Sequence, residues 1–118
     1  MSTVRIWNKQ FELELIYDCY EGEEVLDGQV KALDSFLSSN DSYEDFLLNV
    51  KEYCKEHDGI VISDDSKLFS FVIPRYLFVT RDSKVSIMCD YRCDMEHGIA
   101  VVFKDGKVDQ IGIQDIVL

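Results

Sequence analysis

The sequence predicts a two-layer α+β domain, in which a mostly antiparallel sheet of about five or six strands carries two consecutive helices on one face. Apolar and polar residues alternate near the N-terminus and again in the last third of the chain, as in half-buried strands. Between these regions, two segments repeat apolar residues at helical spacing. Asp105-Gly106, between two apolar stretches, is a strong signal for a β-hairpin. The alternative is a sheet curled far enough to close part of a barrel.

Length and composition indicate one folded domain over residues 1–118, because 118 residues suffice for a single hydrophobic core. Hydrophobic residues make up 47% and charged residues 30% of the chain, which is typical of globular proteins. No apolar run approaches the ~20 residues that cross a bilayer, and residues 1–9 lack the pattern of a signal peptide. We therefore expect a cytoplasmic protein with free thiols, namely Cys19, Cys54, Cys89 and Cys93.

The N-terminal half is expected to form two strands and two helices. Val4 to Trp7 is a short strand candidate, and Asn8-Lys9 turns the chain into a strand from Phe11 to Tyr17. The first helix is predicted from an apolar stripe of Leu26, Val30, Leu33 and Leu37, flanked by Val25 and Phe36. Asp41 or Ser42, with Glu44 or Asp45 three residues later, can begin a second helix, which Gly59 ends.

The C-terminal half is expected to supply the rest of the sheet. Residues 60–62 are a possible strand, and residues 68–73 fit either a strand or a helical turn closed by Pro74. Four clearer strands follow at Tyr76–Arg81, Val85–Tyr91, Ile99–Phe103 and Val108–Ile113. Residues 114–118 then extend the sheet or cover its edge.

The charge of the chain is strongly negative and unevenly distributed. The net charge is −11 at pH 7, and residues 12–65 hold 16 acidic and three basic residues. This charge argues against nucleic acid and anionic membranes as partners, since both would repel it. It is either a solvated surface that maintains solubility or a face that attracts a basic protein. The candidate partner-binding residues, expected to gather at one end of the helical layer, are Tyr20, Glu21, Glu23, Glu24 and Asp27.

One segment, residues 89–98, concentrates the groups that could perform chemistry. A zinc site is one interpretation of this segment, with ligands drawn from Cys89, Asp90, Cys93, Asp94 and His97. The favoured interpretation is a connecting loop, in which Asp94 caps a turn, Glu96 and His97 hydrogen-bond each other or the backbone, and Gly98 adopts a torsion that other residues resist. The chain lacks a glycine-rich phosphate loop, an H-E-x-x-H helix and a serine nucleophile elbow. We therefore predict no catalytic residue and no cofactor.

Several motifs resemble a family of small bacterial domains of unknown function. They are Cys89-Asp90-Tyr91, Asp94-x-Glu96-His97-Gly98, the turn at Asp105-Gly106, Ile111-Gly112-x-Gln114-Asp115, and the acidic stretch 17–22 before a helix with Gln29. Relatives of this kind look like products of loci that encode toxins, where small acidic cytosolic proteins neutralise the toxin. The resemblance therefore implies a bacterial, cytosolic, immunity-like protein. An aromatic residue is expected before Asp94, where this chain has Cys93, and this departure argues against Cys93 as an essential ligand.

Three functions follow as hypotheses. The first is a non-enzymatic binding module, most concretely an immunity-type protein that neutralises a basic toxin through its acidic half. The second is a metal-binding or hydrolytic enzyme centred on the segment from Cys89 to His97. The third is a structural or regulatory subunit that homodimerises through the edge of its sheet, so that the protein is either a monomer or a homodimer.

Overall fold

A single six-stranded sheet organises the molecule, and its strands lie side by side in the order in which they occur in the sequence. The computed structural model describes residues 3–7, 11–39 and 41–117. The strands are β1 (Thr3–Ile6), β2 (Phe11–Tyr17), β3 (Val72–Val79), β4 (Val85–Tyr91), β5 (Ile99–Lys104) and β6 (Lys107–Gly112). The helices are α1 (Asp27–Ser38), α2 (Asp41–Asp58) and α3 (Asp65–Phe71), and a 3₁₀ turn, η1 (Gln114–Ile116), follows β6.

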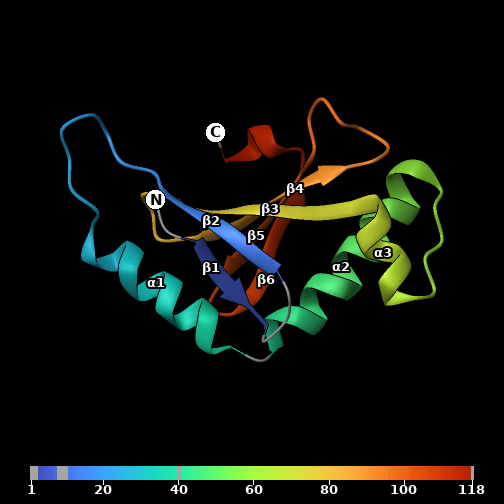
Figure 1. Ribbon diagram of the computed structural model, residues 1–118, viewed down its shortest axis with the longest axis horizontal. Helices are drawn as coiled ribbons and strands as arrows, with labels where there is room; N and C mark the ends of the chain where they lie inside the picture. Colours follow the sequence, from blue (N-terminus) through green and yellow to red (C-terminus); the bar gives the residue numbers. More distant parts are fainter. Residues whose placement is uncertain (1–2, 8–10, 40, 118) are drawn as a thin grey trace.

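The sheet is open and mixed, with one parallel pair among antiparallel neighbours. β2 and β3 run parallel, and the chain between them passes through all three helices. In Figure 1, α1 and the first part of α2 lie below the sheet and α3 lies at the right-hand end of β3, whereas η1 lies above the sheet. The predicted two-layer α+β fold is therefore confirmed, including its mostly antiparallel sheet. The β-hairpin predicted at Asp105-Gly106 is also confirmed, because β5 and β6 pair antiparallel and both turn residues have positive φ angles, of 54° and 81°.

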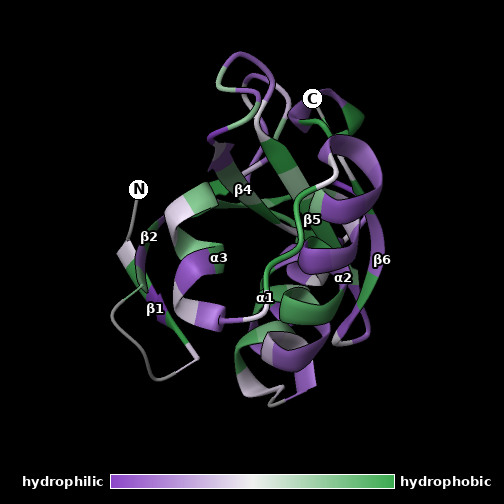
Figure 2. Ribbon diagram, turned by 90° about the vertical axis from the view of Figure 1, so that its right-hand side faces the viewer, coloured by the Kyte–Doolittle hydropathy of each residue, from purple (hydrophilic) through white to green (hydrophobic). Residues whose placement is uncertain are grey.

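The core lies between the helices and one face of the sheet. Alternate residues of β4 and β5, such as Ile87, Cys89 and Val101, are fully buried there. Phe46, Val50 and Cys54 of α2 are fully buried as well. Figure 2 shows the green, hydrophobic colours of β4 and β5 in the middle of the molecule and purple, hydrophilic stretches of α2 on its outside. Burial of this apolar surface is the main favourable contribution to folding.

The outer face of the sheet is also closed over its centre. Met88 and Ala100 are fully buried on that face, and Val102 is 1% exposed. η1 lies over β5 on this side, and a Cβ added to Gly112 would come within 3.2 Å of Ile116 Cγ2. Residues 114–116 therefore cover the sheet as a 3₁₀ turn and do not extend it as a strand.

The first helix presents a different face to the core from the one predicted. Its buried residues are Gln29, Leu33 and Phe36, which follow one another at helical spacing. Leu26, Val30 and Leu37, assigned by the sequence to the buried stripe, are each about 40% exposed. The difference arises because the true buried face contains a polar residue, which a search for apolar periodicity passes over.

Residues 60–79 also differ from the expectation. Residues 60–62 are not a strand, and residues 65–71 form the short helix α3, with Asp64 as its cap: the Asp64 carboxylate accepts the Ser66 N–H at 3.0 Å. β3 begins at Val72 rather than at Tyr76, and Pro74 lies within it. The pairing of β3 with β4 shifts between Pro74 and Tyr76, as at a β-bulge. A bulge is one of the few places where a strand accommodates proline, which has no N–H to donate.

The start and end of α2 are held by specific contacts. Ser42, fully buried in the first turn, donates to the Ser39 carbonyl at 3.2 Å and accepts from Trp7 Nε1 at 2.8 Å. The Asp45 carboxylate accepts the backbone N–H of Val108 in β6, so it joins α2 to the sheet and does not complete a capping box. Gly59, with φ of +66°, ends the helix as predicted. The other boundaries lie within about two residues of the predictions, and the expected turn at Asn8-Lys9 lies outside the described residues.

Candidate functional site: the acidic loop and the helix that follows it

The acidic loop, defined here as residues 18–26, joins β2 to α1 at one end of the sheet. It begins where the parallel strands β2 and β3 both end, and the Asp18 N–H donates to the Val79 carbonyl at 2.8 Å. The loop then arches away from the sheet and down to α1 (Figure 1). Loops at the carboxyl ends of neighbouring parallel strands often carry binding residues, because the strands fix both ends of the surface.

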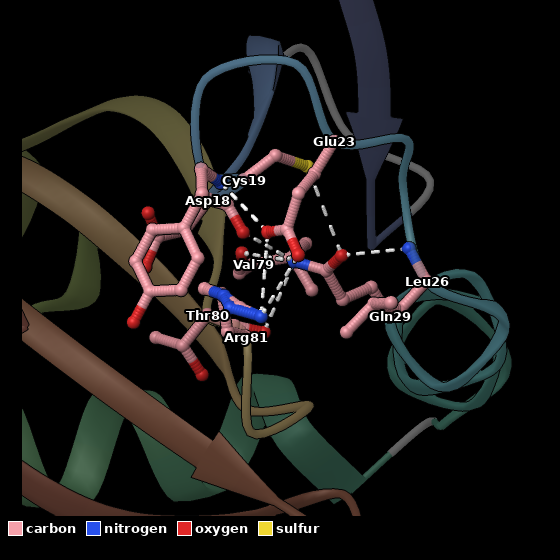
Figure 3. A network of polar contacts seen from close by, with 9 residues as sticks. Asp18, Cys19, Glu23, Leu26, Gln29, Val79, Thr80 and Arg81 are labelled. Carbon is pink, nitrogen blue, oxygen red and sulfur yellow. Dashed lines mark hydrogen bonds and ion pairs between the residues drawn. The ribbon is translucent and has the colours of Figure 1, made fainter.

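Gln29 fixes this loop to the sheet. The residue is fully buried, and its side-chain nitrogen donates to the carbonyls of Asp18 at 3.0 Å and of Val79 and Thr80 at 3.2 Å. Its side-chain oxygen accepts the Leu26 N–H at 2.9 Å, and the Cys19 thiol lies 3.9 Å from the same oxygen. Figure 3 shows the Gln29 amide reaching from α1 to the ends of both strands. One buried amide therefore joins the loop, the helix and the sheet.

A second contact holds the outer part of the loop. The Arg81 guanidinium stacks over the Tyr20 ring, with Cζ 3.8 Å from the ring centroid. Arg81 Nη2 also lies 3.3 Å from the Glu23 carboxylate, which accepts the Tyr20 N–H at 3.0 Å. Glu23 therefore maintains the shape of the loop and is not a free charge.

The remaining candidate residues are exposed. Glu21, Glu24 and Asp27 are exposed and form no hydrogen bond or ion pair through their side chains within the part of the chain that the structure describes. Tyr20 is 68% exposed although its ring is fixed by Arg81. An exposed apolar surface continues from the loop along α1. We call it the α1 stripe, and its residues are Val25, Leu26, Val30 and Leu37, which are 39–42% exposed.

A shallow pocket of about 380 Å³ lies beside the loop. Its apolar lining comes from Val102 of β5 together with Ile116 and Val117, and Tyr20 and Arg81 also line it. The Nε atom of Arg81 is the one buried side-chain nitrogen or oxygen without a hydrogen bond among the described residues. The loop thus combines an exposed aromatic ring, a guanidinium group and a small hollow at one end of the molecule.

The second segment singled out by the sequence, residues 89–98, has a different character. Cys89 is fully buried and faces the helical layer within the core, where burial raises the pKa of its thiol well above the ordinary range. Asp90 forms an ion pair with Arg75 Nε at 2.6 Å, and Cys93 is exposed. Of the five possible metal ligands, the side chains of Asp94 and His97 alone are bonded to each other. Over residues 3–7, 11–39 and 41–117, no group of three or more Cys, His, Asp or Glu residues is arranged to hold a metal ion.

Asp94 and His97 instead build the loop. The Asp94 carboxylate accepts the backbone N–H of His97 at 3.2 Å and lies 3.1 Å from His97 Nδ1. The hydrogen bond and the negative charge of Asp94 raise the pKa of His97 above its ordinary value of 6.5. The Asp94 carbonyl accepts the Gly98 N–H at 2.9 Å. The expectation that Asp94 caps a turn is therefore confirmed, whereas His97 pairs with Asp94 and not with Glu96.

Gln114 closes the same loop from the C-terminal side. Its side-chain amide donates to the Cys89 carbonyl at 3.0 Å, and its backbone N–H donates to the His97 carbonyl at 3.1 Å. Gly98, with φ of +62°, sits against both contacts, because an added Cβ would lie 2.5 Å from the Cys89 carbonyl oxygen and 2.6 Å from Gln114 Nε2. Side-chain and backbone contacts thus fix this segment as a structural connection.

The sequence did not identify Arg81 or the role of Gln29. Arg81 contacts Glu23, which precedes it by 58 residues, and no local sequence pattern predicts such a pair. Gln29 does leave a local signal, since it stands four residues before Leu33 and seven before Phe36, on the buried face of α1. A polar residue in line with apolar ones predicts a buried hydrogen-bonding group.

Comparison with known proteins places the chain in a family. The model for a domain of unknown function, DUF6985, matches residues 1–118. The chain belongs to the DUF6985 family. No curated protein and no solved structure matches it. In this DUF6985 member, the C-terminal residues that carry the resemblance noted above, among them Asp94, Gly98 and Gln114, serve the loop geometry just described. None of the helices in the described residues is long and apolar enough to span a membrane.

Proposed function

We propose that this DUF6985 member is a non-enzymatic protein-binding module of a bacterial cytoplasm, and that it binds a basic protein through the acidic loop and the α1 stripe. In its most concrete form, it is an immunity-type protein that neutralises a basic toxin. The observation that carries the proposal is that the exposed α1 stripe lies beside carboxylates with no partner among the residues that the structure describes.

The composition of this surface supports a protein partner. Protein interfaces typically place apolar and aromatic residues at the centre and polar residues at the rim. Val30 and Leu37 offer apolar area on α1, and Tyr20 offers a large ring that Arg81 holds in place. A ring fixed before binding loses little conformational entropy on association, which favours tyrosine as an anchor.

The charge of the surface supports a basic partner. Glu21, Glu24 and Asp27 keep their negative charges unpaired within the described residues, so their field extends into solvent. Such a field accelerates association with an oppositely charged protein and orients it. The net charge of −11 adds a long-range attraction toward the same basic partner.

The test begins with co-purification of the protein with basic proteins encoded by neighbouring genes, followed by measurement of the association rate by stopped flow. The E21K/E24K variant should associate about tenfold or more slowly at low salt, and within about twofold of wild type at 0.5 M salt, because salt screens exposed charges. Glu23 is left unchanged because its carboxylate is bonded to Arg81 and to the backbone of Tyr20.

A matched control makes the same change in charge at the opposite end of the sheet. Glu96 and Asp115 are both exposed there, beside the loop that follows β4. The E96K/D115K variant should lose little of the association rate. If E21K/E24K and E96K/D115K slow association equally, the net charge alone is responsible and the acidic loop is not the interface.

A further inference from the structure

A groove on a different part of the surface lies between α2 and the edge strand β6. We call it the α2–β6 groove, and its volume is about 320 Å³. Five of its lining residues come from one face of α2, and the sixth comes from β6. They are Asn49, Glu52, Tyr53, Glu56, His57 and Ile111. A hydrogen bond from the Val108 N–H to the Asp45 carboxylate joins β6 to α2, so the fold fixes the two elements that form the groove.

The charge in the groove comes mainly from two carboxylates. Glu52 and Glu56 are one helical turn apart and exposed, and neither carboxylate has an ion pair or hydrogen bond in the described parts of the chain. Among the residues that the structure describes, no lysine or arginine lines the groove. Lys51 and Lys55 lie on the other side of Glu52, around a separate hollow with Leu48 and Val61, and Lys51 is paired with Asp65 at 2.5 Å. Two carboxylates therefore face a groove in which His57 is the one basic side chain among the described residues, and Glu52 also borders the hollow of Lys51 and Lys55.

An aromatic pair and free acceptors complete the groove. The rings of Tyr53 and His57 are stacked, with centroids 4.1 Å apart and planes 17° apart. Tyr53 is only 9% exposed, and its hydroxyl has no hydrogen bond to any residue that the structure describes. The Asn49 amide nitrogen donates to the Asp45 carbonyl at 2.8 Å, which leaves its oxygen as an acceptor. Ile111 supplies an apolar surface on the β6 side.

We propose that the α2–β6 groove binds the guanidinium group of an arginine side chain from a protein partner. A guanidinium is planar and carries five N–H donors, so it can stack on the outer face of the exposed His57 ring, whose inner face covers Tyr53, while donating to the carboxylates of Glu52 and Glu56. The methylene stem of the arginine would lie on Ile111. Lysine fits less well, because a compact ammonium neither stacks on a planar pair nor reaches two carboxylates at once. This inference does not rest on the acidic loop, which lies on a different element.

The experiment is an NMR titration of the whole protein with N-acetyl-L-arginine amide as the probe. The matched probe is N-acetyl-L-citrulline amide, which has nearly the same shape and no charge. Backbone signals of Asn49, Tyr53, His57 and Ile111 should shift saturably with the arginine probe. The citrulline probe should bind about fivefold or more weakly, as loss of an ion pair with two carboxylates implies.

Variants separate the groove from the general charge of the protein. E52Q/E56Q should weaken binding of the arginine probe about fivefold or more, whereas E21Q/E24Q removes the same charge from the acidic loop and should leave it unchanged. Equal binding of the arginine and citrulline probes, or wild-type binding by E52Q/E56Q, would overturn the proposal. Equal binding of N-acetyl-L-lysine amide would overturn the assignment to guanidinium. None of these outcomes bears on the association rate of the E21K/E24K variant, so the two proposals fail independently.

Discussion

The acidic loop and the loop after β4, residues 92–98, leave opposite ends of the same sheet and are held in opposite ways. The acidic loop is anchored from inside by the buried amide of Gln29, and its outer carboxylates, Glu21 and Glu24, remain unpaired within the described residues. The loop after β4 uses its own polar groups, Asp94 and His97, to bond to each other. The segment in which the sequence concentrates reactive residue types is therefore one whose Asp94 and His97 are already bonded to each other. Free groups are what a partner can bind.

The two loops should also differ in how they tolerate amino-acid substitutions. Much of the acidic loop stands clear of the rest of the protein, and a Cβ added to Gly22 would meet nothing within 4 Å. The loop after β4 is packed against the sheet, so its glycine and its polar contacts depend on one another. We therefore expect substitutions in the loop after β4 to affect stability, and substitutions on the outside of the acidic loop to affect binding.

The largest effect is expected from Gly98→Ala. Gly98 has φ of +62°, and its Cβ would lie 2.5 Å from the Cys89 carbonyl oxygen, so both torsional strain and a backbone clash oppose the change. We expect a loss of about 3 kcal/mol or more in the free energy of unfolding, measured by urea denaturation. Gly22→Ala is the matched control, since φ is +82° there but the space is open, and it should cost about 1 kcal/mol. Equal losses would show that the loop after β4 yields to the clash and is not rigidly packed.

The next largest effect is expected from Gln29→Met, which keeps the size of the side chain and removes its polar atoms. The part-buried Asp18 carbonyl and Leu26 N–H would lose their partners, and the buried Val79 and Thr80 carbonyls would lose one donor each, which should cost about 2–3 kcal/mol in the free energy of unfolding. Hydrogen exchange should accelerate at the amides of residues 18–26 more than at those of β4. Gln110→Met is the control, because Gln110 is exposed. A uniform acceleration throughout the sheet would mean that Gln29 supports the whole fold and not the loop in particular.

The sequence predicted most of the fold because alternation and helical spacing are local. β2 and β4 have the predicted bounds, from Phe11 to Tyr17 and from Val85 to Tyr91. The prediction was wrong about the buried face of α1, where the polar residue Gln29 takes a core position through hydrogen bonds to two strands. It was also wrong about the start of β3, because a bulge lets the strand continue through Pro74. In both places, a contact distant in sequence outweighs the local preference.

The candidate site was predictable to the extent that its contacts are local. The Asp94–His97 pair spans three residues, and the role of Asp94 as a turn cap follows from the sequence. The Arg81–Glu23 pair spans 58 residues, so the sequence treated Glu23 as equivalent to the exposed Glu21 and Glu24. The same limit applies to the α2–β6 groove, where Ile111 of β6 lies far along the chain from the α2 residues that it faces. Exposure and pairing are properties of the fold, and they decide which charges a partner can use.

The smallest effect concerns the pKa of His97. It tests how strongly the charged groups of the loop after β4 are paired with one another. Asp94 raises the pKa of His97, so the protonated pair stabilises the folded state below pH 6.5, and this contribution is lost as the pH rises through the raised pKa. Asp94→Asn keeps an acceptor for the His97 N–H and removes the charge, so the pKa of His97, followed by NMR of the imidazole, should fall. Asp115→Asn removes the same charge from the weakest contributor to the shift and should lower the pKa less. Equal shifts in the two variants would mean that His97 responds to the general negative field of the protein. In that case the hydrogen bond to Asp94 would not be what holds the imidazole, and the loop after β4 would resemble the acidic loop in leaving its charged groups available to a partner.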